Sequence, residues 1–193
     1  MKLAGRIAKG LVVFVIFFLN ALFILRCCFA ADQRTLAALI PTPALRAAYA
    51  AADGEPEILT HKVVREISEN GYMSAYSFAW APQAREVQIT VRYNDSVYSY
   101  NALPEETEFR FVLTDSASGA QFTPDVAASE EKLMYNYRRL VFSGVEVSET
   151  SDLTLIMYCG DEEITRDVIH YADQNVVNEP YKLSRAEREA LGG

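Results

Sequence analysis

The stretch Val87-Gln-Ile-Thr-Val-Arg-Tyr93 decides the fold class of this chain of 193 residues. Its apolar residues alternate with polar ones, and successive side chains of an extended strand point to opposite faces. Alternation of this kind is typical of antiparallel strands that pack one face against a core. The stretch therefore predicts a half-buried strand.

Further strands are predicted on both sides of it. Apolar positions alternate with other residues at Tyr76, Phe78 and Trp80, at Phe109, Phe111 and Leu113, and at Leu153, Leu155, Met157 and Cys159. Residues 137–147 have a mixed strand pattern, residues 164–171 predict one more strand, and residues 59–67 suit either a strand or a helix. Turn residues separate these runs at Asn70-Gly71, Ala81-Pro82, Asn94-Asp95-Ser96, Ser118-Gly119 and Gly160-Asp161. About seven or eight short strands at this spacing predict a mainly β domain, an antiparallel β-sandwich over residues 57–180.

Three blocks of sequence add a family resemblance to this pattern. They are Phe109-Arg-Phe-Val-Leu-Thr-Asp-Ser-Ala-Ser-Gly119, Arg139-Leu-Val-Phe-Ser-Gly-Val145 and Leu153-Thr-Leu-Ile-Met-Tyr158. Their order resembles that of the telokin-like, immunoglobulin-like accessory domains of bacterial surface proteins, over residues 85–160. The resemblance implies an immunoglobulin-like β-sandwich, and it implies no catalytic residues.

Residues 11–31 predict a transmembrane helix. They are apolar except at Asn20 and Arg26. At about 1.5 Å per residue this run spans about 30 Å, which matches the hydrocarbon thickness of a bilayer. Arg26 lies near the outer end, where its guanidinium can reach the headgroups while its stem stays in lipid.

The flanking charges predict the orientation of this helix. Three basic residues precede it and no acidic residue does, so residues 1–10 are expected in the cytoplasm and residues 32–193 on the far side of the membrane. A signal peptide has similar features, so cleavage near Ala31 and secretion of the domain is the alternative.

Two helical segments are expected to flank the β domain. Residues 32–56 are rich in alanine, contain Pro41 and Pro43, and predict a helical stalk or linker, whose apolar residues could instead pack on the domain or on the membrane. In residues 181–193, the sequence Ser184-Arg-Ala-Glu187 has the spacing of a capping box and predicts a short helix that ends at Gly192.

Charge and cysteine content narrow the functional classes. Four of the 18 basic residues lie in the anchor region, which leaves residues 32–193 with 14 basic and 26 acidic side chains, a net charge of −12. An acidic domain is repelled by phosphate backbones, so nucleic acid is not an expected partner. Cys27, Cys28 and Cys159 form no disulfide framework, and Cys159 is expected in the core as a small apolar side chain.

Signatures of catalysis and metal binding are missing from the sequence. His61 and His170 have no metal-ligand spacing, and the chain has no H-E-x-x-H and no G-x-S-x-G. Asp161, Glu162 and Glu163 could bind calcium together with Asp115 or Asp125, but a solvated loop is the favoured interpretation. We therefore expect no enzyme, no cofactor and no metal. A catalytic triad assembled from distant residues stays a third possibility, since triads are recognised by geometry.

Tyrosine is the unusual residue type, with eleven copies. Tyr98 and Tyr100 share one face of a short extended stretch, and Tyr135 and Tyr137 do the same next to Arg138. Exposed tyrosine and arginine are enriched at binding hot spots. The leading hypothesis is a membrane-anchored module that binds a protein partner through these residues. The alternatives are a carbohydrate-binding or other ligand-binding surface, and packing of the tyrosines inside the sheets.

Overall fold

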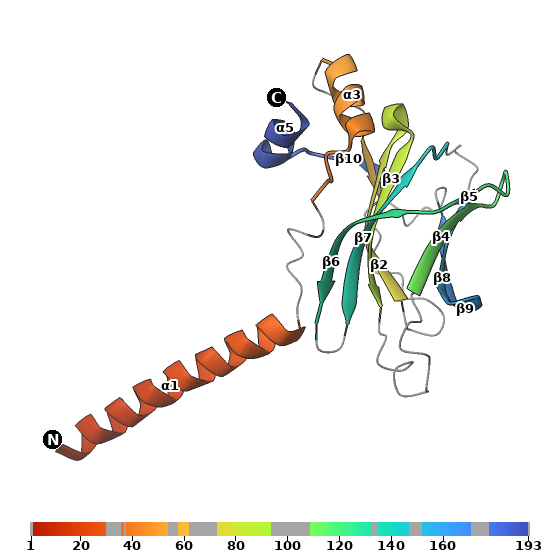
Figure 1. Cartoon of the computed structure of the whole chain (residues 1–193). Helices are drawn as coiled ribbons and strands as arrows, with labels where there is room; N and C mark the ends of the chain where they lie inside the picture. Colours follow the sequence, from red (N-terminus) through yellow and green to blue (C-terminus); the bar gives the residue numbers. More distant parts are fainter. Residues whose placement is uncertain are drawn as a thin grey trace.

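The protein is mainly β and contains two antiparallel sheets (Figure 1). The computed structural model describes residues 2–29, 36, 38–53, 58–61, 73–93, 109–132, 135–146, 152–170 and 178–192. The six-stranded sheet has the order β10-β1-β2-β3-β7-β6, and the four-stranded sheet has the order β5-β4-β8-β9. The strands are β1 (Leu59–His61), β2 (Met73–Ala81), β3 (Glu86–Tyr93), β4 (Phe109–Asp115), β5 (Gln121–Phe122), β6 (Asp125–Glu131), β7 (Asn136–Ser143), β8 (Asp152–Cys159), β9 (Glu162–His170) and β10 (Asn178–Pro180). The helices are α1 (Lys2–Phe29), α3 (Pro43–Ala51) and α5 (Arg185–Leu191), with a 3-10 turn η1 (Pro82–Ala84).

The two sheets share one apolar core, which alternating residues of both sheets supply. From the six-stranded sheet come Phe78, Trp80, Val87, Ile89, Val91, Tyr93, Leu140 and Phe142; from the four-stranded sheet come Phe111, Leu113, Leu153, Leu155 and Met157. The apolar residues of the stretch Val87–Tyr93 thus face the core, as their alternation predicted. Cys159 is a buried free thiol, and burial raises its pKa.

The pairing of β2 is interrupted by a β-bulge. The pairing of β2 with β3 shifts between Ala75 and Ser77, so the strand has a bulge there. Before the bulge the core residues of β2 are Met73 and Ala75, and after it they are Phe78 and Trp80. Phe78 and Trp80 thus face the core as the alternation predicted, and the bulge lets the odd-numbered Met73 and Ala75 face it as well, because an extra residue exchanges the two faces of a strand.

Strands β5 and β6 were not predicted from the sequence. They follow each other closely in the chain but belong to different sheets, and the segment crosses from one sheet to the other (Figure 1). Most of β6 is exposed and has no apolar alternation. Residues 59–61, which suited a helix or a strand, form β1 and pair with β2 and β10.

The outer face of the six-stranded sheet is covered by chain segments from both ends of the domain. A second apolar cluster joins Leu39, Leu45 and Tyr49 to Ala79 of β2 and Leu191 of α5. The apolar residues before and within α3 therefore pack on the β domain. As a result β3 is buried on both faces, and the expectation of a half-buried strand was wrong.

Both short helices have capped ends. Thr42 accepts a hydrogen bond from Leu45 N at the start of α3, where proline occupies the first turn. In α5, the Ser184 side chain accepts from Glu187 N, and the Glu187 carboxylate accepts from Ser184 N (2.7 Å). Gly192 then ends the helix with φ 109°. The predicted C-terminal capping box is confirmed.

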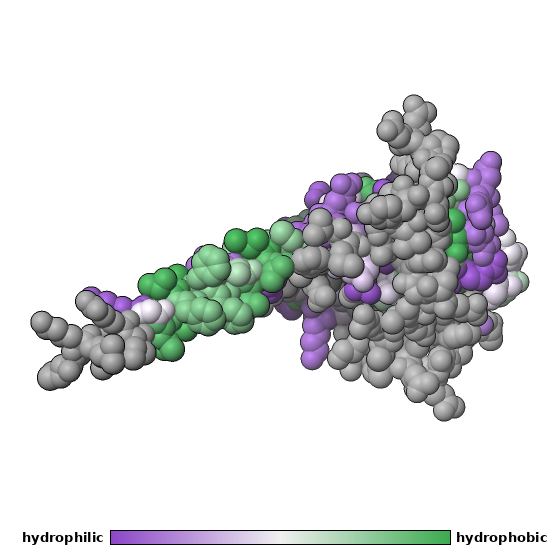
Figure 2. All heavy atoms as spheres, turned by 90° about the horizontal axis from the view of Figure 1, so that it is seen from below, coloured by the Kyte–Doolittle hydropathy of each residue, from purple (hydrophilic) through white to green (hydrophobic). Residues whose placement is uncertain are grey.

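Helix α1 is long and apolar enough to cross a membrane over Lys9–Cys28, and none of that span is buried in the domain. Figure 2 shows it as a largely apolar rod that projects to one side of the molecule. An apolar helix of a water-soluble core would be covered by other elements, whereas a membrane span or a signal sequence would not.

Candidate functional site

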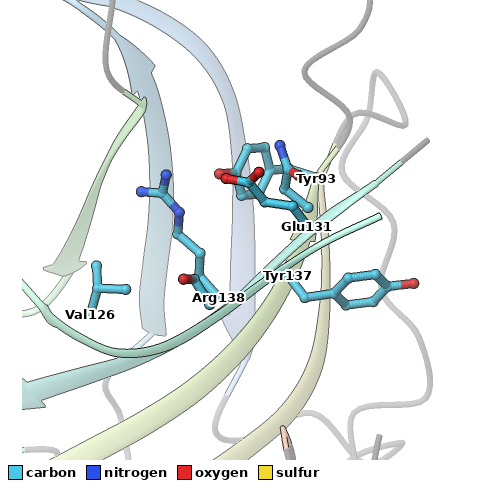
Figure 3. Close-up of a pocket in the computed structure, with 7 residues that line it drawn as sticks. Tyr93, Val126, Glu131, Tyr137 and Arg138 are labelled. Carbon is cyan, nitrogen blue, oxygen red and sulfur yellow. The ribbon is translucent and has the colours of Figure 1, made fainter. Parts of the chain in front are cut away.

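A hollow of about 220 Å³ lies beside β6, at the edge of the six-stranded sheet. The residues that line it come from β3, β6 and β7: Tyr93, Val126, Ser129, Glu131, Asn136, Tyr137 and Arg138. Figure 3 shows Arg138 and Tyr137 leaving β7 in opposite directions, as neighbouring residues of a strand do. The hollow lies at the β6 edge of the six-stranded sheet, on the side of the sheet that faces the shared core.

Arg138 lies on the inner side, in line with the core residues Leu140 and Phe142 of the same strand. Its guanidinium donates a long hydrogen bond to the Phe109 backbone carbonyl of the opposite sheet (3.4 Å). It also lies over the ring of Tyr93, 5.5 Å from the centroid. Tyr93 in turn packs edge-on against Phe111 at 5.5 Å. Arg138 thus covers the end of the core with its stem and presents a half-buried cation to the hollow.

The tyrosines proposed for binding have different surroundings. Tyr137 is only 6% exposed, so little of its ring is available to a partner. Tyr135 is half-buried, and the Arg92 guanidinium lies 4.3 Å from its ring centroid. Tyr98 and Tyr100 lie outside the described residues. The structure therefore brings Tyr135, Tyr137 and Arg138 to one end of the sheet, with Arg138 and Tyr135 partly accessible there.

The strand β6 contributes features that the sequence did not indicate. It is an edge strand of the six-stranded sheet, so one side of its backbone has no neighbouring strand among the described residues. Val126 is 50% exposed, and outside α1 it is the one large apolar side chain so exposed in the described part of the chain. At the end of the strand, Glu130 forms an ion pair with Lys132 (2.5 Å) and raises the pKa of that amine. Because β6 lacks alternation, no sequence signal marked Val126.

A buried polar network lies on the opposite, outer face of the same sheet. Its centre is Arg139, which is 0% exposed. One guanidinium nitrogen donates to Ser77 Oγ and to Thr90 Oγ1 (2.7 Å each), and the other donates to Gln88 Oε1 (3.3 Å). Burial lowers the pKa of Arg139 to about 10, and Tyr181, Glu187 and Glu86 act in the opposite direction. In the described part of the chain no carboxylate lies within ion-pair distance of it.

This network holds Leu36 and residues 38–42, which we together call the strap, on the sheet. The Gln88 side chain accepts a hydrogen bond from Ile40 N (2.9 Å) and donates one to Ile40 O (2.8 Å), as a neighbouring strand would. Thr90 donates to Leu36 O (2.7 Å). Thr42 donates to the Glu86 carboxylate (2.6 Å), which also accepts from Gln88.

Glu187 fixes the strap from the C-terminal helix. Its carboxylate accepts hydrogen bonds from Leu39 N (3.0 Å) and from the Tyr181 hydroxyl (2.5 Å). Burial alone raises the pKa of Glu187, but the hydrogen bonds from Tyr181, Leu39 and Ser184 outweigh it, and the pKa lies below its usual value. Burial, followed by the hydrogen bond to Glu187, raises the pKa of Tyr181.

Two of the carboxylates considered for calcium bind neighbouring groups of the protein. Asp115 accepts hydrogen bonds from Ala117 N (3.1 Å) and Ser118 N (3.2 Å) within its own turn, and Gly119 completes the turn with φ 71°. Glu163 is bound to Arg166 by two hydrogen bonds. Among the residues that the structure describes, no group of three or more metal-ligating side chains occurs. His61 and His170 belong to β1 and β9, in different sheets.

Comparison with protein-family models, with curated proteins and with solved structures finds no match for this chain.

Proposed function

We propose that this protein is a single-pass membrane protein whose extracytoplasmic domain, an immunoglobulin-like β-sandwich, binds an extended segment of a protein partner along β6. The observation that carries the proposal is the open edge of β6 with the exposed Val126 and the hollow of Arg138 beside it.

The membrane part of the proposal rests on α1. Its apolar side chains from Leu11 to Leu25 are largely exposed, which is unfavourable in water and favourable in hydrocarbon. The basic residues before the span favour a cytoplasmic N-terminus.

The size and shape of the hollow favour a polypeptide over a small ligand. Pockets for small molecules usually enclose about 300 to 1,000 Å³, and this one has about 220 Å³. A peptide strand that adds to β6 would take its affinity from backbone hydrogen bonds, and alternate side chains would reach the hollow. A side chain with an oxygen acceptor suits the Arg138 guanidinium, and an apolar one suits Val126.

The charges of β6 restrict the partner. Asp125, Glu130 and Glu131 lie along this short strand, and charged residues on an edge oppose pairing with a second copy of the same edge. A partner strand with basic residues at the facing positions would be attracted instead.

A photo-crosslinking amino acid at Val126, in the full-length protein in its native membranes, tests the proposal. The matched control is the same amino acid at Arg166, which is exposed on β9 in the other sheet. We expect a discrete adduct from position 126 that is absent from position 166 and is lost when Arg138→Glu is added. Equal adducts from both positions, or none from either, would refute the β6 edge as the binding surface.

Orientation is tested separately, by adding protease outside intact cells or spheroplasts. We expect digestion of the domain, and protection until lysis would refute the orientation. A soluble form that begins near Ala31 would show that α1 is a cleaved signal.

A further inference from the structure

Asn20 places a polar side chain near the middle of the Lys9–Cys28 span. Its Nδ2 donates a hydrogen bond to Ile16 O of the same helix (2.8 Å), and the side chain is on the exposed surface of α1. The carboxamide still has a second N–H and an oxygen with two lone pairs. Hydrocarbon offers neither donors nor acceptors, so these groups need a partner inside the membrane.

The residues that share a face with Asn20 form a stripe suited to helix pairing. At about 100° per residue, the positions three and four residues apart on that face are Val13, Ile16, Phe23 and Cys27. Spacing of this kind is that of the seam between two helices that cross at a small angle. The stacked pair Phe14 and Phe18, with ring centroids 6.1 Å apart, lies on the other side of the helix, where lipid would cover it.

We propose that α1 pairs with α1 of a second copy of this chain along this stripe, with the two Asn20 carboxamides hydrogen-bonded to each other. The partial charges are complementary, because each carboxamide presents a positive N–H and a negative oxygen, and a two-fold axis brings each against its opposite. The inference rests on the proposed membrane insertion of α1.

The pairing has a geometric consequence at the outer end of the span. Cys27 follows Asn20 by seven residues, so it lies within about 20° of the same stripe and about 10 Å further along the axis. Cys28 is rotated by a further 100° or so and leaves the seam. The Cys27 thiols of two copies therefore face each other, whereas the Cys28 thiols do not.

Oxidative cross-linking of the full-length protein in membranes tests this arrangement. Cys28→Ser leaves Cys27 as the thiol of the span, Cys27→Ser leaves Cys28, and Cys159 is buried in both. Copper–phenanthroline catalyses oxidation by dissolved dioxygen: two thiols lose two protons and two electrons, an S–S bond forms, and the dioxygen that accepts them is reduced to hydrogen peroxide. We expect a covalent dimer of twice the chain mass from the Cys27 form, and several-fold less from the Cys28 form.

Moving the carboxamide provides the matched control. Asn20→Leu should weaken dimerisation about threefold to twentyfold, the range measured for single hydrogen bonds between membrane helices. Restoring the carboxamide at a similar depth on the other side, by adding Phe18→Asn to Asn20→Leu, should not restore the Cys27 cross-link.

Alkaline carbonate extraction distinguishes membrane insertion of α1 from its dimerisation. Release of the full-length chain by carbonate would refute membrane insertion and this inference with it. A chain that stays in the membrane, but whose Cys27 cross-linking is unchanged by Asn20→Leu or equals that of Cys28, would overturn the dimer alone. A Cys27 adduct with the mass of a different protein would overturn the second copy as the partner.

Discussion

Replacing Arg139 by methionine isolates the contribution of the buried guanidinium to stability. Methionine keeps most of the length and apolar volume of the arginine stem but donates no hydrogen bond. The remaining groups of the network keep partners, since Ser77 still donates to Thr90 (3.0 Å) and Thr90 still donates to Leu36 O. The change therefore removes the cation and its hydrogen bonds and leaves no hydroxyl without a partner.

The expected magnitude follows from two opposing contributions. Three hydrogen bonds to a charged donor contribute about 1.5 to 3 kcal/mol each, or about 5 to 9 kcal/mol together. The pKa of Arg139 is lowered from 12.5 to about 10 by burial, against the opposing influence of Tyr181, Glu187 and Glu86, and this corresponds to a net cost of about 3 kcal/mol for the charged form. The difference predicts that Arg139→Met lowers the free energy of unfolding by about 2 to 6 kcal/mol.

Urea unfolding of the full-length protein in detergent measures this loss, with the fluorescence of Trp80, the single tryptophan and a core residue, as the signal. Arg138→Met is the matched control, since Arg138 is the adjacent residue, is half-buried and makes one long hydrogen bond. We expect a loss below about 1 kcal/mol there. Equal losses at both positions, or a more stable Arg139→Met, would refute the reasoning and mean that desolvation cancels the hydrogen bonds.

Three further predictions concern the core, the C-terminal helix and the thiols. Phe111→Ala should lower the free energy of unfolding by about 3 to 5 kcal/mol, against less than about 1 kcal/mol for the exposed Val126→Ala, and a similar loss at both would contradict the observed core. Because the folded-state pKa of Glu187 is lowered, its contribution is present above the unfolded pKa of about 4.3 and is lost as pH falls through the folded value. Melting temperatures from pH 6 to pH 3 should therefore fall less steeply in Glu187→Gln, and parallel curves would contradict this. A maleimide added to the folded protein in detergent should modify the exposed Cys27 and spare the buried Cys159, whose pKa is raised, and modification of Cys159 before unfolding would show that the thiol is accessible.

The sequence predicted those parts of the fold that depend on local pattern. Alternation in β3, β4 and β8 revealed which residues face the core, and the capping box at Ser184 revealed the C-terminal helix. The strand β6 escaped prediction because an exposed edge strand needs no apolar face. The bulge in β2 was not predicted, because the alternation of Tyr76, Phe78 and Trp80 in the sequence gives no sign of an inserted residue.

Alternation does not determine whether the polar face of a strand is exposed to solvent. Gln88 and Thr90 were expected to face solvent, yet both are buried, because the strap crosses the sheet from a distant part of the chain. The same long-range covering explains why Arg139 could not be recognised as a buried residue. Of the site, Tyr135, Tyr137 and Arg138 were chosen from residue type, whereas Val126 and the open edge required the order of the strands.

Fixing the strap to the sheet sets a limit on how far the domain can stand from the membrane. Residues 30–35 separate the end of α1 from Leu36, whose carbonyl accepts a hydrogen bond from Thr90 on the sheet. The seven steps along the chain from the end of α1 to Leu36 reach at most about 25 Å even when fully extended. With α1 in a bilayer, the domain would be confined to a shell about as deep as the headgroup layer and the water next to it. A partner would then have to be anchored in the same membrane or come to its surface, and the local concentration of such partners would depend on membrane area rather than on compartment volume.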